Sequence, residues 1–166
     1  MIFSSIPFLY YFLPAVLAVY YLTPRRGKNA VLLLASLFFY GWGEPKLLWL
    51  MVFTIAVFYL CGLAIGRSAH HKKAWLSLSV CVGAGLLGLY KYADFFITSV
   101  NAATGMSLPL LKLALPVGIS FYTFQCLSYT VDVYRGMVPS QKNLIAFGAY
   151  VALFPQLIAG PIVRYS

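Results

Sequence analysis

A stripe of polar side chains runs through an otherwise apolar stretch of the chain, residues 115–136. Placed on an α-helix at about 100° per residue, its members fall within an arc of about 100°. They are Gly118, Phe121, Gln125, Ser128, Asp132 and Arg135, with Tyr122 and Tyr129 on its flanks. Amides, hydroxyls and carboxylates are costly inside a bilayer and must face protein, water or a substrate. The stripe therefore predicts a buried polar path. The side chains of this helix expected to line it are Tyr122, Gln125, Ser128, Tyr129, Asp132 and Arg135.

Some of these polar residues also have a simpler interpretation. Arg135 follows Asp132 by three residues, so the two can form an ion pair on one helix face. Equally, both side chains can extend to the lipid headgroups as an interfacial pair. Ser128 can bond back to its own helix. Gln125 lies deeper, and its amide needs a partner from another helix or from a substrate.

The remaining reactive side chains predict neither a catalytic residue nor a metal site. His70 and His71 are the only histidines, and they stand in a basic stretch, residues 67–73, that is typical of a solvated loop. The three cysteines lie inside apolar segments, without C-x-x-C spacing or a histidine partner. We interpret them as packing residues. No bound cofactor is expected.

Composition places the chain among integral membrane proteins. Of its 166 residues 62% are hydrophobic and only 9% are charged, and the mean hydropathy is +0.86. Soluble domains carry about a quarter of charged residues. The net charge of +9 comes from Lys and Arg in short segments between apolar runs, as the positive-inside rule requires, so we expect a lipid bilayer and not nucleic acid as the partner.

The apolar runs predict an all-α, polytopic membrane protein with about six membrane-embedded helices in a single domain, residues 1–166. They cover residues 6–22, 30–42, 47–65, 74–90, 116–136 and 143–158. The second is shorter than the roughly 20 residues that a span needs, so whether it fully crosses stays open. Residues 94–112 are the longest polar interval and are expected to form a surface loop. Pro155, Gly160 and Pro161 are expected to end the last run in a packed, non-helical turn.

The basic residues predict an orientation. If the six runs all cross, eight Lys and Arg fall in the segments on one side and four on the other. The first set is Arg25, Arg26, Lys28, Arg67, Lys72, Lys73, Arg135 and Lys142, and the second is Lys46, Lys91, Lys112 and Arg164. The positive-inside rule then places the first set in the cytoplasm and the N-terminus outside.

Four stretches of the chain are similar to the membrane-bound O-acyltransferase family. They are Met1–Ser5, Leu34–Gly43 (LASLFFYGWG), the helix Pro116–Gly136 and Phe154–Ile162 (FPQLIAGPI). Together they resemble the bacterial branch that contains the alginate O-acetyltransferase and the D-alanyl transfer protein of teichoic acid synthesis. The residues alone, which include no G-x-S-x-G, H-E-x-x-H or P-loop motif, do not define a reaction.

The resemblance implies a helical shell around a tunnel in a bacterial cytoplasmic (inner) membrane. Through it, an acyl group from an activated cytoplasmic donor would reach a hydroxyl on an exported polysaccharide such as alginate. The polar stripe would line that path, and Pro155, Gln156, Gly160 and Pro161 would help to wall the reaction centre. Extracytoplasmic polysaccharide-modification proteins are the partners expected by analogy.

One departure from the family limits what is carried over. The family's catalytic histidine lies in a later segment beside a tryptophan, and this chain contains no Trp-His pair. We therefore expect the N-terminal portion of an acyltransferase with an incomplete fold, inactive by itself. The alternative is a non-catalytic membrane scaffold or export-partner subunit. A small channel or transporter ranks last, because only one helix carries paired charges.

Overall fold

The computed structural model describes residues 6–43, 45–68 and 70–159, and within these ranges it is all-helical without a β-strand. In chain order the elements are the π-helical turn η1 (Phe8–Phe12), α1 (Leu13–Leu22), α2 (Lys28–Gly43), α3 (Pro45–Arg67), α4 (Lys72–Leu87), the π-helical turn η2 (Gly88–Tyr92), α5 (Ala93–Thr104), α6 (Ile119–Tyr134), α7 (Leu144–Ala152) and α8 (Phe154–Ala159). The predicted all-α class is confirmed.

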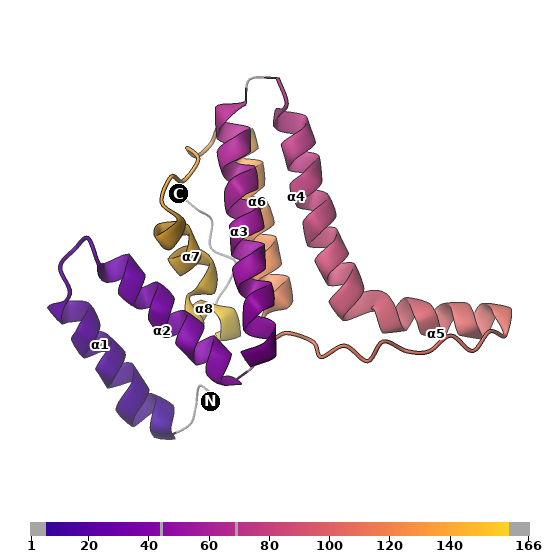
Figure 1. The fold of residues 1–166 in the computed structure, drawn as a ribbon, viewed down its shortest axis with the longest axis horizontal. Coiled ribbons are helices and arrows are strands. Elements are labelled where there is room, and N and C mark those ends of the chain that lie inside the picture. The colour runs from indigo at the N-terminus through magenta and orange to yellow at the C-terminus, as the bar shows by residue number, and fades with distance from the viewer. Residues whose placement is uncertain (1–5, 44, 69, 160–166) are drawn as a thin grey trace.

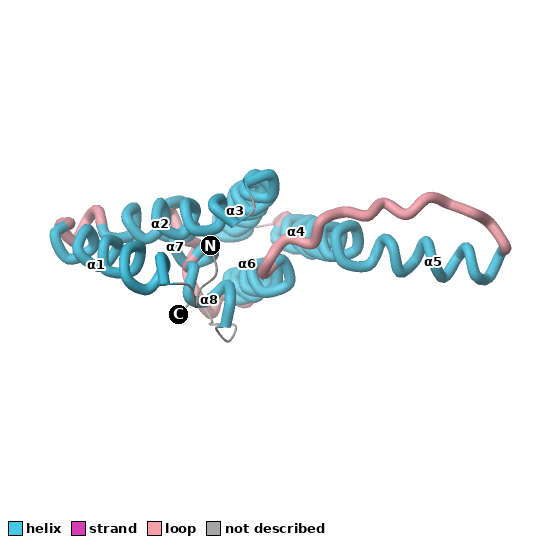
Figure 2. Tube along the Cα trace, turned by 90° about the horizontal axis from the view of Figure 1, so that it is seen from below, coloured by secondary structure: helices cyan, strands magenta, loops and turns pink. Residues whose placement is uncertain are grey.

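The helices alternate in direction, apart from α5. In Figure 1, α1, α3 and α6 rise while α2, α4 and α7 descend, so the three connections richest in Lys and Arg all follow rising helices. Helix α3 packs against α4 and α6, and α2 packs against α7. Helix α5 and the extended segment behind it leave this bundle sideways as a long arm, which Figure 2 shows from below.

Local sequence explains where several helices begin and end. The side chain of Asn143 accepts hydrogen bonds from the N–H groups of Ile145 and Ala146 and so caps the start of α7. Gly105 ends α5 in the left-handed conformation (φ +69°), and Gly118 precedes α6 in the same conformation (φ +74°). Glycine adopts this conformation without the steric cost that a side chain brings.

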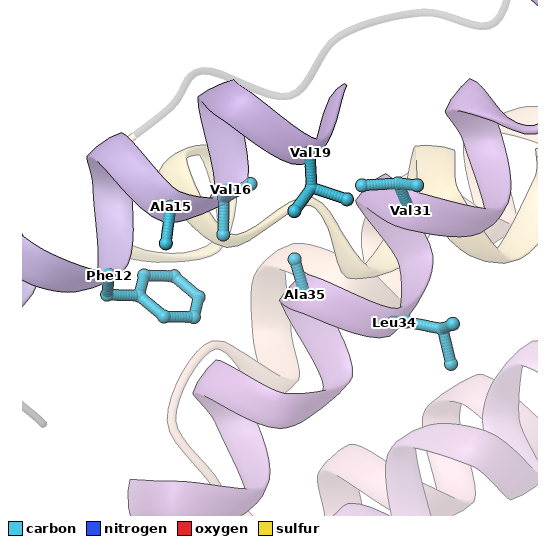
Figure 3. Close-up of a pocket in the computed structure, with 7 residues that line it drawn as sticks. All are labelled: Phe12, Ala15, Val16, Val19, Val31, Leu34 and Ala35. Carbon is cyan, nitrogen blue, oxygen red and sulfur yellow. The ribbon is translucent and has the colours of Figure 1, made fainter. Parts of the chain in front are cut away.

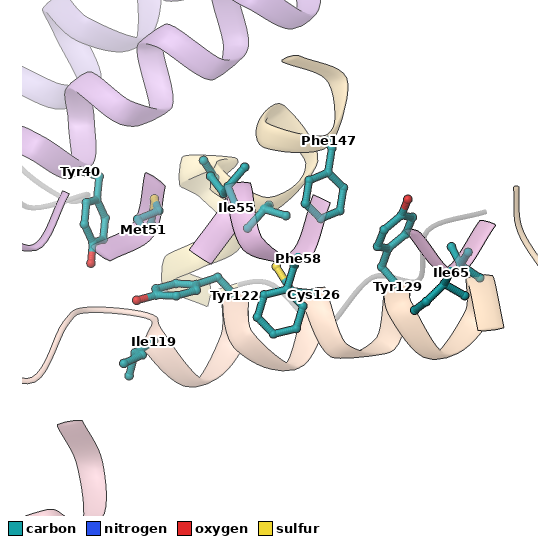
Figure 4. Packing of buried hydrophobic residues seen from close by; sticks show 13 residues of the cluster. Tyr40, Met51, Ile55, Phe58, Ile65, Ile119, Tyr122, Cys126, Tyr129 and Phe147 are labelled. Atoms are coloured by element: carbon teal, nitrogen blue, oxygen red, sulfur yellow. The ribbon is translucent and has the colours of Figure 1, made fainter. Parts of the chain in front are cut away.

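The core lies between α3, α6 and α7, with Tyr122, Phe58, Tyr129 and Phe147 fully buried in it (Figure 4). The rings of Tyr129 and Phe147 lie 4.8 Å apart, centroid to centroid. Gly62 of α3 lies directly against the Tyr129 ring, because a Cβ on Gly62 would sit 2.6 Å from Tyr129 Cε1. A small residue at this point is what lets the two helices approach.

A second cluster ties the first and last described helices together. Phe8, Phe12, Phe39 and Phe154 are in mutual contact, with ring centroids 5.2–5.8 Å apart in all pairings. Rings at these separations in tilted and edge-on arrangements attract one another beyond their hydrophobic burial. Helix α2 is thereby held between η1 and α8.

Two local predictions were wrong. Residues 94–104 form helix α5 rather than a surface loop: the hydroxyls of Thr98, Ser99 and Thr104 bond back to carbonyls four residues earlier and so do not disrupt the helix. Residues 154–159 are helical, not a non-helical turn, because proline is tolerated in a first helical turn, where Pro155 lies. The chain instead breaks at Leu153, while Gly160 and Pro161 lie outside the described residues.

Two helical stretches are long and apolar enough to cross a membrane. They are Pro45–Arg67 and the continuous Lys72–Thr104, and two shorter apolar stretches, Phe8–Leu22 and Leu144–Gln156, accompany them. The described helices thus provide two candidate spans by length and composition, where the apolar runs predicted about six.

We expect the change Gly62→Ala to lower the free energy of unfolding by about 1–3 kcal/mol, since the added methyl group overlaps the buried Tyr129 ring. Gly85→Ala is the matched control, because nothing lies within 4 Å of a Cβ there. Thermal unfolding in detergent, monitored by maleimide labelling of the buried Cys61 and Cys126, measures the stability of both variants. Equal stability of the two variants would contradict the close contact.

Candidate functional site

The predicted polar stripe lies along the edge of the packed face of α6. Gln125 and Asp132 are on the buried side, with 3% and 6% of their surface exposed. Phe121 is 44% exposed, Arg135 is exposed, and Ser128 is half-buried. The stripe is thus not enclosed as a unit, and its two most polar internal groups are Gln125 and Asp132.

Gln125 bridges a break between two helices. Helix α7 stops at Ala152 because Leu153 has φ −53° and ψ 110°, outside the helical region, and α8 starts at Phe154. A continuous helix would join the Phe154 N–H to the Tyr150 carbonyl. Instead, Gln125 Nε2 donates to the Tyr150 carbonyl oxygen at 3.0 Å.

The backbone N–H group that the break leaves without its helical acceptor also has a partner. The N–H of Phe154 donates to Ser36 Oγ of α2 at 3.3 Å, and Ser36 is fully buried. Two buried polar side chains, one from α2 and one from α6, therefore replace one backbone hydrogen bond between α7 and α8. In an apolar environment an unsatisfied backbone group costs several kcal/mol, so this replacement is a condition for the break.

The two tyrosines beside the stripe belong to the core. Tyr122 and Tyr129 are both fully buried. Tyr129 Oη accepts a hydrogen bond of 2.8 Å from the N–H of Gln141, in the segment between α6 and α7. Tyr59 of α3 donates to the carbonyl of Lys142 in the same segment at 2.7 Å. Tyrosine hydroxyls thus hold this connection against the helices.

The structure does not form the predicted pair between Asp132 and Arg135. No ion pair is present in residues 6–43, 45–68 and 70–159, and the backbone of Arg135 ends α6 with its side chain exposed. The Asp132 backbone carbonyl accepts from the N–H of Met137, whereas its carboxylate has neither a hydrogen bond nor an ion pair with another described residue. Its oxygens keep some accessible surface, since they are not among the fully buried side-chain atoms of the described chain that lack a hydrogen bond.

Two of the four residues predicted to wall the reaction centre, Pro155 and Gln156, lie in α8, directly after the break. Pro155 is exposed, and the half-buried Gln156 donates its backbone N–H to the Leu153 carbonyl at 3.0 Å. The hydrogen bond from Gln125 to Tyr150 holds the end of α7, directly before these residues, beside α6. Gly160 and Pro161 belong to the residues outside the described part of the chain.

Sequence reasoning missed the polar residues on the other helices. Ser36 was available as a signal, because it is the only hydroxyl-bearing residue between Ala30 and Phe39. It also missed the buried hydrogen bond of 3.3 Å between Ser79 of α4 and Thr130 of α6. Both residues also bond to carbonyls of their own helices, which a sequence cannot distinguish from a bond between helices.

Among the described residues, the two larger hollows are apolar and are lined by no residue of the stripe. One of about 310 Å³ separates α1 from α2 and is lined by Phe12, Ala15, Val16, Val19, Val31, Leu34 and Ala35 (Figure 3). Side chains of this kind suit an acyl chain or lipid tail and supply no acid, base or nucleophile. Among the described residues, no group of three His, Cys, Asp or Glu could hold a metal ion.

We expect Gln125→Leu to lower the free energy of unfolding by about 1–3 kcal/mol, because the hydrogen bond from the buried Gln125 amide to the Tyr150 carbonyl is lost. Ser128→Ala, one turn further along α6, removes a hydroxyl with no hydrogen bond in the described chain and should change stability little. The same thermal labelling assay compares them, and an unchanged midpoint for Gln125→Leu would contradict the bridging role.

The chain aligns over its whole length with known bacterial proteins. It is 46% identical over 172 residues to the probable alginate O-acetylase AlgI of Pseudomonas syringae, with 99% of this chain and 33% of that protein covered. It is 45% identical over 173 residues to the Pseudomonas aeruginosa protein of the same name, covering 100% and 33%. A peptidoglycan O-acetyltransferase of Helicobacter pylori is 32% identical over 197 residues, covering 100% and 37%.

The chain spans about a third of the length of these curated relatives. No protein-family model matches it, and no solved structure matches it significantly. The relatives and the apolar helices together identify a membrane protein. Along its whole length this chain is a homologue of the bacterial alginate O-acetylases, and the predicted resemblance to the membrane-bound O-acyltransferases is confirmed.

Proposed function

We propose that this chain is the N-terminal part of a membrane-bound O-acetyltransferase that acetylates hydroxyls of an exported polysaccharide such as alginate. The observation that carries the proposal is the alignment of the entire chain, at 41–46% identity, with proteins named alginate O-acetylase. The residues that bridge the break, Ser36 and Gln125, lie within two of the stretches on which the family resemblance rests.

In the proposed reaction the acceptor hydroxyl oxygen attacks the carbonyl carbon of an activated acyl donor. The hydroxyl loses its proton to a base, and the bond between the acyl carbon and the donor breaks, with its electron pair going to the donor. This chain supplies no residue that we assign as the base. Its proposed contribution is a polar passage along α6, in which Gln125 and Asp132 are the buried polar members of the stripe and Pro155 and Gln156 follow the break that Gln125 bridges.

The proposed topology is multi-pass in the bacterial inner membrane, with about six membrane-embedded helices and the N-terminus outside. The alternating helix directions support it, since all three strongly basic connections follow rising helices in Figure 1. Extracytoplasmic polysaccharide-modification proteins would then meet the opposite end of the bundle. The donor would reach the basic, cytoplasmic end.

The chain alone is expected to be inactive, because it contains no Trp-His pair. Residues 1–166 in lipid nanodiscs, mixed with radiolabelled acetyl-CoA and mannuronate oligomers, should leave no label on the sugar above a protein-free blank. Label transferred by this polypeptide alone would contradict the expectation. If the chain were instead an export scaffold, deleting its coding sequence in the host would lower the amount of exported polysaccharide rather than its ester-linked acetate.

Asp132→Asn in the host gene tests the passage directly. The substitution keeps the shape of the side chain and removes a charge that has no partner among the described residues, so stability should hold. We expect ester-linked acetate on the polysaccharide to fall about tenfold or more, which corresponds to a loss of about 1.4 kcal/mol in the transition state.

Proton NMR of the exported polymer gives the acetate content, and immunoblotting gives the protein level. Gly85→Ala is the control, since the position is exposed and nothing lies within 4 Å of a Cβ there. Normal acetylation with Asp132→Asn, at a normal protein level, would show that the Asp132 carboxylate has no role in the passage.

A further inference from the structure

Helix α5 and the extended segment 105–117 form an arm that leaves the bundle sideways (Figures 1 and 2). The chain turns at η2, directly after α4, and runs across the direction of the bundle helices. The extended segment then returns alongside α5 to the start of α6. Near this base Lys91 Nζ donates to Ser120 Oγ at 3.4 Å, which joins the turn to α6.

Two polar side chains of α5 hold the arm together. Asn101 bonds to both backbone groups of Leu108: its Nδ2 donates to the carbonyl at 3.0 Å, and its Oδ1 accepts from the N–H at 2.9 Å. One carboxylate, that of Asp94, accepts from the N–H groups of Leu111 and Lys112. The arm is therefore a built unit, with its segment fixed to the helix at two points seven residues apart on α5.

The contact with Asp94 lies where the alternation of apolar residues along the extended segment is interrupted. Alternate residues are apolar before it (Met106, Leu108, Leu110) and after it (Leu113, Leu115, Val117), but the alternation shifts by one position at Leu111 and Lys112. Lys112 has φ +47°, the only positive φ of a non-glycine residue in the described chain. A side chain makes this conformation unfavourable, and Lys112 adopts it at the point where its N–H group donates to Asp94.

The arm exposes large apolar side chains on both elements. Phe96 and Val100 share a face of α5 one turn apart, and they are 61% and 42% exposed. Phe95 packs edge-on against the Phe96 ring, with centroids 5.7 Å apart. Thr98 lies about 160° around the helix from Phe96, so this helix has one apolar and one more polar face.

The backbone of the extended segment decides where such an arm can lie. It pairs with no strand in the described chain, and a lipid-exposed extended backbone cannot enter the hydrocarbon core, where water does not satisfy its polar groups. A row of exposed apolar side chains, on the other hand, favours leaving water. The two conditions are met together at the boundary between headgroups and acyl chains.

We propose that α5 and residues 105–117 form an interfacial arm that lies flat on the bilayer and binds lipid through its apolar face. The base of the arm carries Lys91, Tyr92 and Lys112, which are residue types that anchor proteins at this depth. By the proposed orientation the arm belongs to the outer leaflet. The inference goes beyond acetyl transfer and depends only on α4 crossing the membrane.

Spin labels on cysteines of the full chain in phosphatidylcholine and phosphatidylglycerol vesicles test this arm. Cys81 of α4 is the exposed native thiol, whereas Cys61 and Cys126 are buried, so Cys81→Ser gives a background of low reactivity. Labels are placed at Phe96→Cys and Thr98→Cys in that background, with Val100→Cys as a second apolar site. Native Cys81 reports the middle of α4, and His71→Cys in the same background reports the aqueous end.

Power saturation with oxygen and with a water-soluble nickel complex gives the depth of each label. We expect the labels at 96 and 100 to lie between those at 81 and 71, about 5–10 Å below the headgroup boundary. The label at 98 should be more accessible to nickel than the label at 96. A deep label at 81 with water-exposed labels at 96 and 100 would overturn the proposal.

Two other outcomes would also contradict the interfacial arm, each for a different reason. Labels at 96 and 100 that neither oxygen nor nickel reaches would mean that protein covers the arm instead of lipid. A label at 81 that is not deep would refute the crossing of α4, and with it the basis of the arm, without bearing on acetyl transfer.

Discussion

One broken backbone hydrogen bond organises the described structure. The bond that would join the Phe154 N–H to the Tyr150 carbonyl is opened at Leu153, and its two ends are taken by Ser36 and Gln125. Each replacement bond comes from a different helix, so α2 and α6 must both stand beside the break. The phenylalanine cluster then covers the same point, because Phe154 also packs its ring against Phe8, Phe12 and Phe39. The two hydrogen bonds fix the place of the break between α7 and α8, and aromatic packing covers it.

Close contacts between the other helices follow a related constraint. In lipid there is little hydrophobic gain from joining two apolar helices, so packing and polar contacts must hold them. Gly62 admits the Tyr129 ring between α3 and α6, and Gly83 lies against Leu127 between α4 and α6. The bond between Ser79 and Thr130 adds a polar contact to the second interface. Small and hydroxyl-bearing residues therefore appear at the closest points of these two interfaces, beside the bulky side chains that fill the core.

The sequence allowed the helices to be located but not their breaks or partners. Hydropathy finds the positions of α3 and α6 because long apolar runs need little context. It fails at residues 94–104, where Thr98 and Ser99 look like loop residues but bond to their own helix. It also fails at Leu153, since a leucine carries no signal for a break. The sequence left the partner of Gln125 open between another helix and a substrate, because a backbone carbonyl freed by that break cannot be read from a sequence.

The polar residues of α6 divide by whether the fold uses them. Gln125 and Tyr129 are engaged in bonds that hold α7 and its preceding segment, so their presence is explained by folding alone. Asp132 is almost as buried as Gln125, and no described residue engages its carboxylate. Its carboxylate oxygens keep some accessible surface, since they are not among the fully buried side-chain atoms of the described chain that lack a hydrogen bond. Among the described residues, the fold thus uses Gln125 and Tyr129 in named bonds and the Asp132 carboxylate in none, so Asp132 is the residue of the stripe whose presence the proposed passage has to explain.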